Sequence, residues 1–162
     1  MAHKLYDYYW RLYQPETILR ATNNTIRGKS TRHDVERMLE HGIIETMQDV
    51  WELLRTETFT PSEYTKKTIN DGKERHLKIA PLVPDRVVHH CIVDELENYL
   101  KNMYVKCTYA CIKGRGIHKC LEDLNKALKE DKRNTKYCLK IDIRHYYESI
   151  SHEVLKALLL RQ

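Results

Sequence analysis

The stretch LKIDIRHYYESI, from Leu139 to Ile150, places a single acid, Asp142, in an apolar run and follows it with two adjacent tyrosines. The overlapping stretch YCLKIDI, residues 137–143, is typical of a β-strand that is buried on both faces. A carboxylate is costly to bury unless it is paired or holds a metal ion. Asp142 is therefore either an acceptor of hydrogen bonds at the end of a strand or a metal ligand.

The composition of the whole chain is typical of a globular, helix-rich protein. The chain has 162 residues, of which 41% are hydrophobic and 31% are charged, with only 5 Gly and 4 Pro. This length fits one domain, or one domain and the start of another. The 28 Lys and Arg against 23 Asp and Glu give a net charge of +5, which permits an anionic partner without requiring one.

The cysteines indicate a reducing compartment. They are five in number and irregularly spaced, and we expect neither a signal peptide nor a membrane span, so reduced thiols in the cytoplasm are the simplest interpretation. A zinc site is the alternative, and its four ligands would be Cys107, Cys111, His118 and Cys120. Their spacing matches no known structural zinc pattern, and Cys120 falls on the apolar face of a helix, so zinc is disfavoured.

The N-terminal residues predict helices. A short helix is expected around Leu5 to Leu12, and a second is expected to begin at Pro15 and to end near Gly28. Apolar residues at helical spacing then predict one long amphipathic helix from Val35 to about residue 56. Gly42 would lie inside that helix at some cost in stability.

A basic hairpin is predicted next. The segment EYTKKTINDGKERHLKI, residues 63–79, has two short runs around an Asp-Gly turn, which is a hairpin signal. Its arms are rich in Lys and Arg. Charge on an exposed hairpin either keeps its edges soluble or allows the hairpin to reach over phosphates.

The remaining segments predict three helices and a glycine loop. Asp85 is expected to cap a helix that continues to about Met103. The loop Lys113-Gly-Arg-Gly precedes a second amphipathic helix, and Ser151 is expected to cap the last one. That last helix carries an apolar stripe formed by Val154, Leu155, Leu158 and Leu159. We expect the stripe to be covered in a larger fold, and otherwise to drive self-association.

Three segments in order resemble the first three conserved blocks of bacterial reverse transcriptases, of the diversity-generating retroelement or group II intron type. They are PDRVVHHCIVDELENYL (84–100), YACIKGRGIHKCL (109–121) and YCLKIDIRHYYESISHEVL (137–155). With the basic hairpin, the resemblance covers about residues 60–162. It implies an α+β right-hand polymerase fold with an N-terminal helical region (1–58), fingers (59–135) and the first strand and helix of a truncated palm (136–162).

The resemblance also implies a nucleotidyl-transfer site. Asp142 matches the first catalytic aspartate, and the backbone carbonyl of Ile143 would be a second ligand of a two-Mg²⁺ centre. Tyr147 matches the aromatic residue that packs under the sugar and selects deoxynucleotides. Arg75 is the best candidate to grip the triphosphate of the incoming dNTP. Further contacts would come from Lys67 and Lys73 to the nucleotide, and from Arg115 and Lys113 to the template.

The resemblance implies an RNA template and a DNA primer, but the sequence contains no Asp-Asp pair to match the family's Tyr-x-Asp-Asp box, and no thumb. We therefore expect the chain alone to be inactive as a polymerase, because one carboxylate cannot hold two metal ions. The alternative is a non-catalytic RNA-binding fingers module of an intron-type maturase. A third possibility is an unrelated helical protein whose similarity is accidental.

Overall fold

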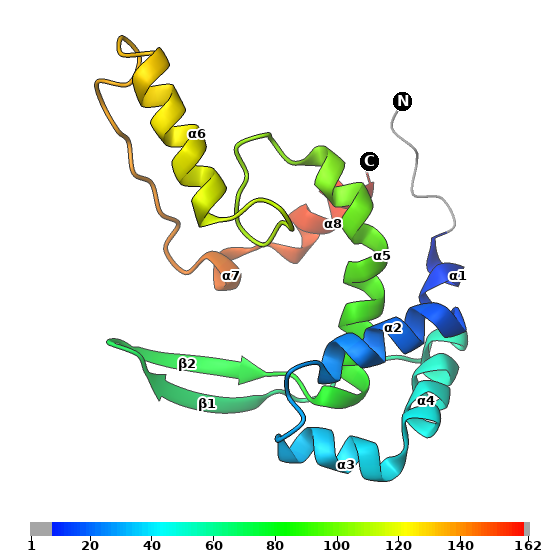
Figure 1. Cartoon of the computed structure of the whole chain (residues 1–162). Helices are drawn as coiled ribbons and strands as arrows, with labels where there is room; N and C mark the ends of the chain where they lie inside the picture. Colours follow the sequence, from blue (N-terminus) through cyan, green and yellow to red (C-terminus); the bar gives the residue numbers. More distant parts are fainter. Residues whose placement is uncertain (1–7, 161–162) are drawn as a thin grey trace. The chain divides into compact units, whose positions relative to one another are not determined.

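A computed structural model describes residues 8–160, except for the side chain of Asn98. These residues form eight α-helices, one irregular helical turn and a two-stranded antiparallel sheet, which confirms the α+β class (Figure 1). Among them, no helix has both the length and the apolar character needed to cross a bilayer. The chain divides into two units, one of which covers Asp7–Asn102 while the other contains Met103–Gln162.

Three helices form the core of the first unit. They are α2 (Pro15–Ile26), α4 (Ile43–Arg55) and α5 (Val87–Met103), whose ribbons lie together in Figure 1. Each helix turns one apolar stripe toward the others. The fully buried residues of this cluster are Ile18, Ala21, Val50, Leu54, Val87, Val88 and Cys91. The short helix α1 (Tyr9–Leu12) packs Leu12 against the cluster. The expectation for Leu5 lies outside the described residues.

A polar seam joins α2 to α5. Glu95 accepts a 3.2 Å hydrogen bond from the hydroxyl of Thr17 and forms an ion pair with Arg20. One turn further along α2, the amide of Asn24 donates to Asp94 over 2.9 Å. Because these side chains lie beside the apolar stripe, they favour one register of the two helices over its neighbours.

The prediction of one long helix from Val35 is wrong. The structure has two helices, α3 (His33–His41) and α4, which are separated by Gly42 at φ 108° and ψ 140°. That conformation interrupts the helix, and it is accessible to glycine far more readily than to other residues. The break allows Val35 and Met38 of α3 to pack on Leu82 in a small cluster of their own.

Replacing Gly42 with alanine should therefore lower the stability of the protein. In an unbroken helix the change would add about 1 kcal/mol of stability, because alanine is the better helix former. At the observed φ it should instead cost about 1–3 kcal/mol. Urea unfolding followed by circular dichroism measures the sign, and an increase in stability would show that the two helices are continuous.

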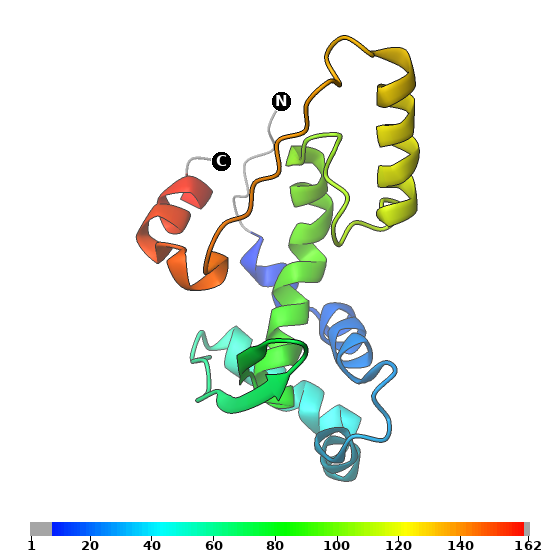
Figure 2. The same cartoon turned by 90° about the vertical axis from the view of Figure 1, so that its left-hand side faces the viewer.

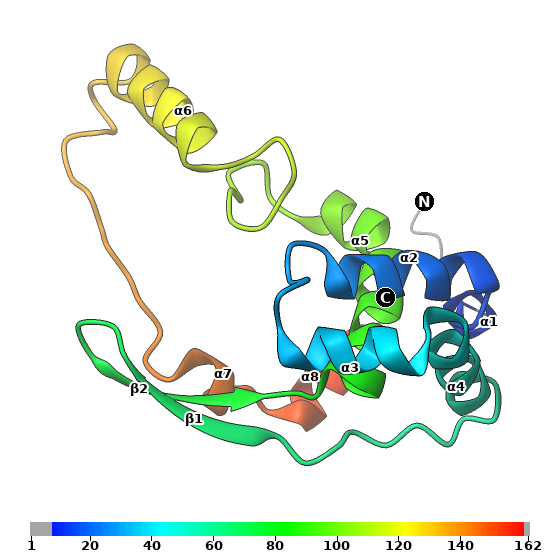
Figure 3. The ribbon, with the colours of Figure 1, turned by 60° about the horizontal axis from the view of Figure 1, so that its bottom comes forward.

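The predicted hairpin is confirmed. Strands β1 (Thr65–Asn70) and β2 (Glu74–Ile79) pair antiparallel, as the two arrows of Figure 3 show. Gly72 adopts φ +68° in the turn, which is the left-handed conformation that an Asp-Gly turn requires. Most of the hairpin side chains are exposed, so its stability depends on the turn and the strand pairing more than on burial.

Asp85 does not cap α5 as the sequence predicts. It lies within the irregular turn Leu82–Arg86 that precedes the helix, and it is fully buried. Its carboxylate accepts hydrogen bonds from the backbone N–H (2.9 Å) and the hydroxyl (2.6 Å) of Ser62. Asp85 therefore links the segment before the hairpin to the segment after it by hydrogen bonds between residues 23 apart in the sequence.

The cysteines differ in exposure, which should be visible in their reactivity. Burial raises the pKa of Cys91 to about 12, so this thiol stays protonated near pH 8. Cys107, Cys111 and Cys138 are exposed. We expect iodoacetamide to label these three in the native protein and to label Cys91 only after unfolding in guanidinium. Native labelling of Cys91 at the same rate as the exposed thiols would contradict the described core.

The described residues of the second unit, 103–160, contain the helices α6, α7 and α8. Helix α6 (Ile117–Glu130) appears where the sequence predicts it, and the single turn α7 (Tyr146–Ser149) leads to α8 (His152–Leu160). The hydroxyl of Ser151 accepts a hydrogen bond from the N–H of Val154 over 3.4 Å, so its capping role is confirmed. The apolar faces of α6 and α8 are largely exposed to solvent.

The strand predicted over residues 137–143 is not formed. This segment runs between α6 and α7 without helix or strand, as the long trace between them in Figure 2 shows. It is not buried either, since Tyr137 is 93%, Leu139 83% and Ile141 76% exposed. A strand needs a neighbour to bond its N–H and C=O groups, and within residues 8–160 the only paired strands are β1 and β2.

Candidate nucleic-acid interface

The register of the hairpin sorts its side chains onto two faces. Lys67 pairs with Leu77, and Ile69 pairs with Arg75. Because directly paired residues share a face and successive residues alternate, one face carries Thr65, Lys67, Ile69, Arg75, Leu77 and Ile79. We call it the Lys67 face. The other, the Lys66 face, carries Lys66, Thr68, Asn70, Glu74, His76 and Lys78.

The Lys67 face places two of the predicted phosphate ligands, Lys67 and Arg75, diagonally opposite each other. Arg75 lies 3.8 Å from Asp71, and both side chains are more than half exposed, so this ion pair is weak. The guanidinium has five N–H donors, and a single long contact leaves most of them free for a second acceptor. The third predicted ligand, Lys73, lies in the turn at the end of the hairpin.

The Lys66 face is also basic, but its side chains interact more closely with each other. Thr68 Oγ1 and His76 Nδ1 are 3.0 Å apart across the strands, and His76 Nε2 lies 3.9 Å from Glu74. Lys66 is directly paired with Lys78, and like charges in this position destabilise a sheet. An anion bound between the two ammonium groups would remove that repulsion.

The hairpin as a whole has an excess of positive charge. Between Thr65 and Ile79 there are five Lys or Arg residues and two carboxylates. All seven of these side chains are exposed. Exposed cations on a narrow ribbon create a positive potential that attracts polyanions over about a Debye length, roughly 8–10 Å at physiological salt.

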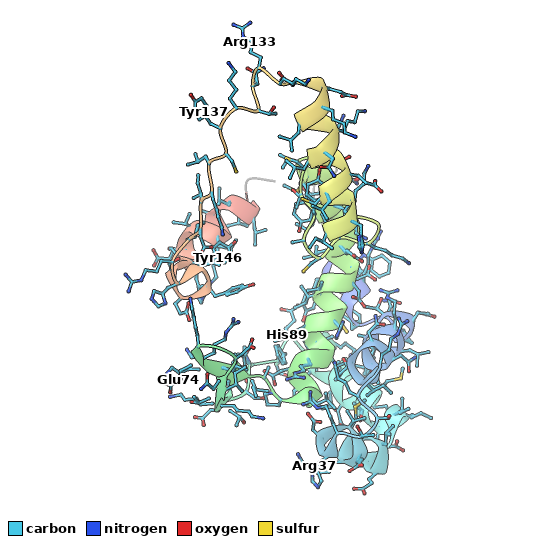
Figure 4. The ribbon with its side chains drawn as sticks, turned by 60° about the vertical axis from the view of Figure 1, so that its left-hand side comes forward. Arg37, Glu74, His89, Arg133, Tyr137 and Tyr146 are labelled. Carbon is cyan, nitrogen blue, oxygen red and sulfur yellow. The ribbon has the colours of Figure 1, made fainter. Side chains whose placement is uncertain are left out.

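A groove of about 520 Å³ adjoins the base of the hairpin within the same unit. We call it the α3 groove, and it is lined by Asp34, Arg37, Met38, His41, Thr46, Thr65, Ile79, Ala80, Pro81, Leu82 and Val83. Thr65 and Ile79 are paired residues of the Lys67 face. The groove therefore continues this face toward α3, from which Arg37 projects (Figure 4).

Arg37 is the exposed cation of the α3 groove. The neighbouring carboxylate, Asp34, accepts hydrogen bonds from the guanidinium of Arg32 at 3.0 and 2.6 Å. Burial acts to raise the pKa of Asp34, but the hydrogen bonds and the charge of Arg32 outweigh it, and the pKa is lowered. His41 Nε2 lies 3.0 Å from Asp49. Sequence reasoning did not identify Arg37 or His41, although their spacing of four residues places both on one face of α3.

The glycine loop of the second unit forms a separate hollow. Arg115 lines it, together with Gly114, Gly116, His118, Lys119 and Glu122, and its volume is about 430 Å³. The predicted partner Lys113 lies in the same loop and is exposed. Lys119 lies 2.9 Å from Asp123, and this contact raises the pKa of Lys119 and lowers that of Asp123. Lys119 is therefore already paired, and Arg115 is the cation available to a ligand in this hollow.

The predicted catalytic residues lie together on one short exposed segment. Asp142 and Ile143 precede a turn at residues 144–145. Tyr147 lies in α7, where the residue is 83% exposed and its ring stands edge-on to that of Tyr146, with the ring centroids 5.2 Å apart. Among residues 8–160 the side chain of Tyr147 is therefore largely open to solvent, without the packing around the ring that a sugar-selecting site would require.

The described residues do not fit a two-metal centre. Across residues 8–160, no three His, Cys, Asp or Glu side chains gather where they could hold a metal ion. Asp142 is a single exposed carboxylate, whereas two Mg²⁺ ions need several oxygen ligands held in a fixed arrangement. We therefore assign no metal-dependent step to these residues.

The site residues predicted from sequence thus fall into two groups on different units. Lys67, Lys73 and Arg75 belong to the hairpin unit, whereas Arg115, Lys113, Asp142, Ile143 and Tyr147 belong to the other. The structure brings the hairpin group together and adds the α3 groove to it. No protein-family model matches the chain, and no curated protein is significantly similar to it.

Proposed function

We propose that the chain is the fingers region and the first palm segment of a reverse transcriptase, and that its hairpin binds the phosphates of nucleic acid or nucleotide. The observation that carries this proposal is the Lys67 face, where Lys67 and Arg75 point the same way from an exposed ribbon. The three sequence blocks supply the link to RNA-directed DNA synthesis. Their order and approximate separation resemble those of the family, and a basic hairpin precedes them in the sequence.

In this proposal the hairpin and the α3 groove form one surface for a phosphate backbone. Arg75 donates two N–H groups to one phosphate, because its planar fork matches a pair of oxygens. Lys67 neutralises the next phosphate as a point charge. Arg37 adds a further cation along the groove, where the half-buried Ile79 and Pro81 offer apolar contact to a base or sugar.

A second candidate is an RNA-binding module without chemistry. The observation that favours it is the single carboxylate at Asp142, which does not by itself form a polymerase centre. Both candidates predict the same binding surface, so binding experiments do not separate them. The reading frame of the native transcript does. A reading frame that also encodes an aromatic-x-Asp-Asp hairpin supports the polymerase, and one without it supports the binding module.

RNA binding by this chain should weaken steeply with salt. Each phosphate contact to a single strand contributes about −0.7 to the slope of log K against log salt. With roughly four contacts the slope should be near −3, so raising salt from about 50 to 200 mM should weaken binding about 50-fold. Fluorescence anisotropy with a labelled oligoribonucleotide measures this slope. An affinity that does not change with salt would reject phosphate contacts as the basis of binding.

A further inference from the structure

The basic hairpin has little side-chain packing of its own to fix its direction. Most of its side chains are exposed, and its two strands extend from the region where α5 begins (Figure 1). A two-stranded hairpin by itself is at best marginally stable in water, so its orientation depends on how its base is attached. The contacts at the two ends of the hairpin therefore decide which way the Lys67 face points.

Two consecutive residues hold both ends of the hairpin. Asp85 holds the incoming end, because its two carboxylate oxygens accept the backbone N–H and the hydroxyl of Ser62 at 2.9 and 2.6 Å, shortly before β1 begins. Arg86 holds the outgoing end, because its Nε–H donates over 3.1 Å to the carbonyl of Ala80, which directly follows β2. We call these three hydrogen bonds the hairpin anchor.

The turn that carries the anchor is itself fixed to the rest of the unit. At its start, Leu82 is buried against α3, whose residues line the α3 groove. Directly after its end, Val87 is buried in the core formed by α2, α4 and α5. The irregular turn Leu82–Arg86 is therefore common to the groove, the core and the hairpin base, and it sets the direction of the hairpin relative to the α3 groove.

The burial of Asp85 makes the anchor costly to break. The side chain is fully buried, and hydrogen bonds to a charged acceptor are roughly twice as strong as those between neutral groups. Removing a donor leaves a buried carboxylate oxygen without a partner, and that group then keeps its full desolvation cost. Because both bonds go to Ser62, they fix the position and the rotation of this residue together.

We propose that Ser62, Asp85 and Arg86 are positioning residues, which hold the hairpin in one direction so that the Lys67 face and the α3 groove bind a single strand of nucleic acid together. They act through the hairpin and do not contact the strand themselves. Two sites held in a fixed relation bind one strand more tightly than two sites that move independently, because less order is lost on binding. The consequence for RNA rests on the proposed function, whereas the fixed direction of the hairpin does not.

Ser62→Ala tests the anchor without changing any charge. It removes the hydroxyl donor to Asp85, and we expect the affinity for single-stranded RNA to fall about 5- to 10-fold, since binding must then order the hairpin. The slope of log K against log salt should stay the same, because every phosphate contact is still made. The loss of a direct contact would instead reduce the slope by about 0.7. Fluorescence anisotropy at several salt concentrations separates the two cases.

Two further variants make the affinity result specific. Ser62→Thr keeps the hydroxyl and should restore the affinity of the wild type. Thr60→Ala removes an exposed hydroxyl from the same segment and should leave the affinity unchanged. A loss of affinity in Thr60→Ala equal to that in Ser62→Ala would overturn the assignment of the effect to the anchor.

The direction of the hairpin is measured without RNA. Nitroxide labels at Asn70→Cys in β1 and Gln48→Cys in α4 occupy exposed positions of the same unit, and double electron–electron resonance gives the distribution of distances between them. We expect a narrow distribution with the intact anchor and a broader one in Ser62→Ala. Arg86→Met, which keeps the apolar stem and removes the donor to the outgoing end, should also broaden it. The four cysteines that are not buried are first replaced with serine: Cys107, Cys111, Cys120 and Cys138.

The two measurements separate a failure of the anchor from a failure of the proposed function. If the wild type binds no RNA, the proposed function fails, and the distance distributions still decide whether the anchor holds the hairpin. Distributions of equal width in the wild type and both variants would overturn the proposal. A hairpin that loosens in Ser62→Ala while the RNA affinity stays unchanged would overturn the positioning role. Circular dichroism checks that each variant keeps its helices.

Discussion

Replacing Lys67 and Arg75 together with glutamine should lower the affinity of the chain for single-stranded RNA by about 100-fold. A charge-assisted hydrogen bond contributes roughly 1.5 kcal/mol or more, and two lost contacts together account for about two orders of magnitude. The salt dependence should change as well, because each lost phosphate contact reduces the slope by about 0.7. Fluorescence anisotropy at several salt concentrations measures both quantities.

The opposite face of the hairpin provides the matched control. Replacing Lys66 and Lys78 with glutamine removes the same charge from the same two strands, and it also removes an unfavourable cross-strand pair. We expect a decrease in affinity of less than 10-fold, from the loss of long-range attraction. Equal losses for the two double variants would show that charge alone binds RNA. An unchanged affinity for the Lys67 and Arg75 variant would remove the hairpin from the interface.

Replacing Ile18 with alanine should lower the free energy of unfolding by about 3 kcal/mol. Ile18 is only 1% exposed and lies in the cluster where α2, α4 and α5 meet. Truncating a buried isoleucine removes apolar contacts and leaves a cavity, and changes of this kind typically cost 2–5 kcal/mol. Urea unfolding followed by circular dichroism measures the loss.

The same truncation at Ile141 should have almost no effect on stability. Ile141 is 76% exposed, so alanine there removes little buried surface, and we expect a change below about 0.5 kcal/mol. A loss at Ile141 as large as that at Ile18 would mean that the segment is buried in the folded chain.

The elements that the sequence predicted correctly depend on neighbouring residues. Pro15 begins α2, and Gly28 follows the end of this helix at φ +69°. The Asp-Gly turn produced the hairpin, and Ser151 caps α8 through a contact three residues away. In each case a proline ring, a missing Cβ or a short side chain limits the local backbone, so no distant residue is needed to explain the result.

The candidate binding surface was predicted in part. The positive charge of the hairpin is evident from composition, and the Asp-Gly turn places Lys67 and Arg75 on one face. The α3 groove was not predicted, because it requires α3 to lie beside the residues that follow β2. That placement results from the packing of Val35 and Met38 on Leu82, which no local pattern indicates.

The sequence by itself determined where most helices and the hairpin begin and end, because caps, turns and apolar spacing act over a few residues. Tertiary structure decided the roles of Gly42, Asp85 and the segment 137–143. Gly42 separates two helices, and the break lets α3 pack on Leu82, whereas Asp85 is buried in contact with Ser62. Residues 137–143 remain outside any sheet, because a strand is completed only by hydrogen bonds from another strand.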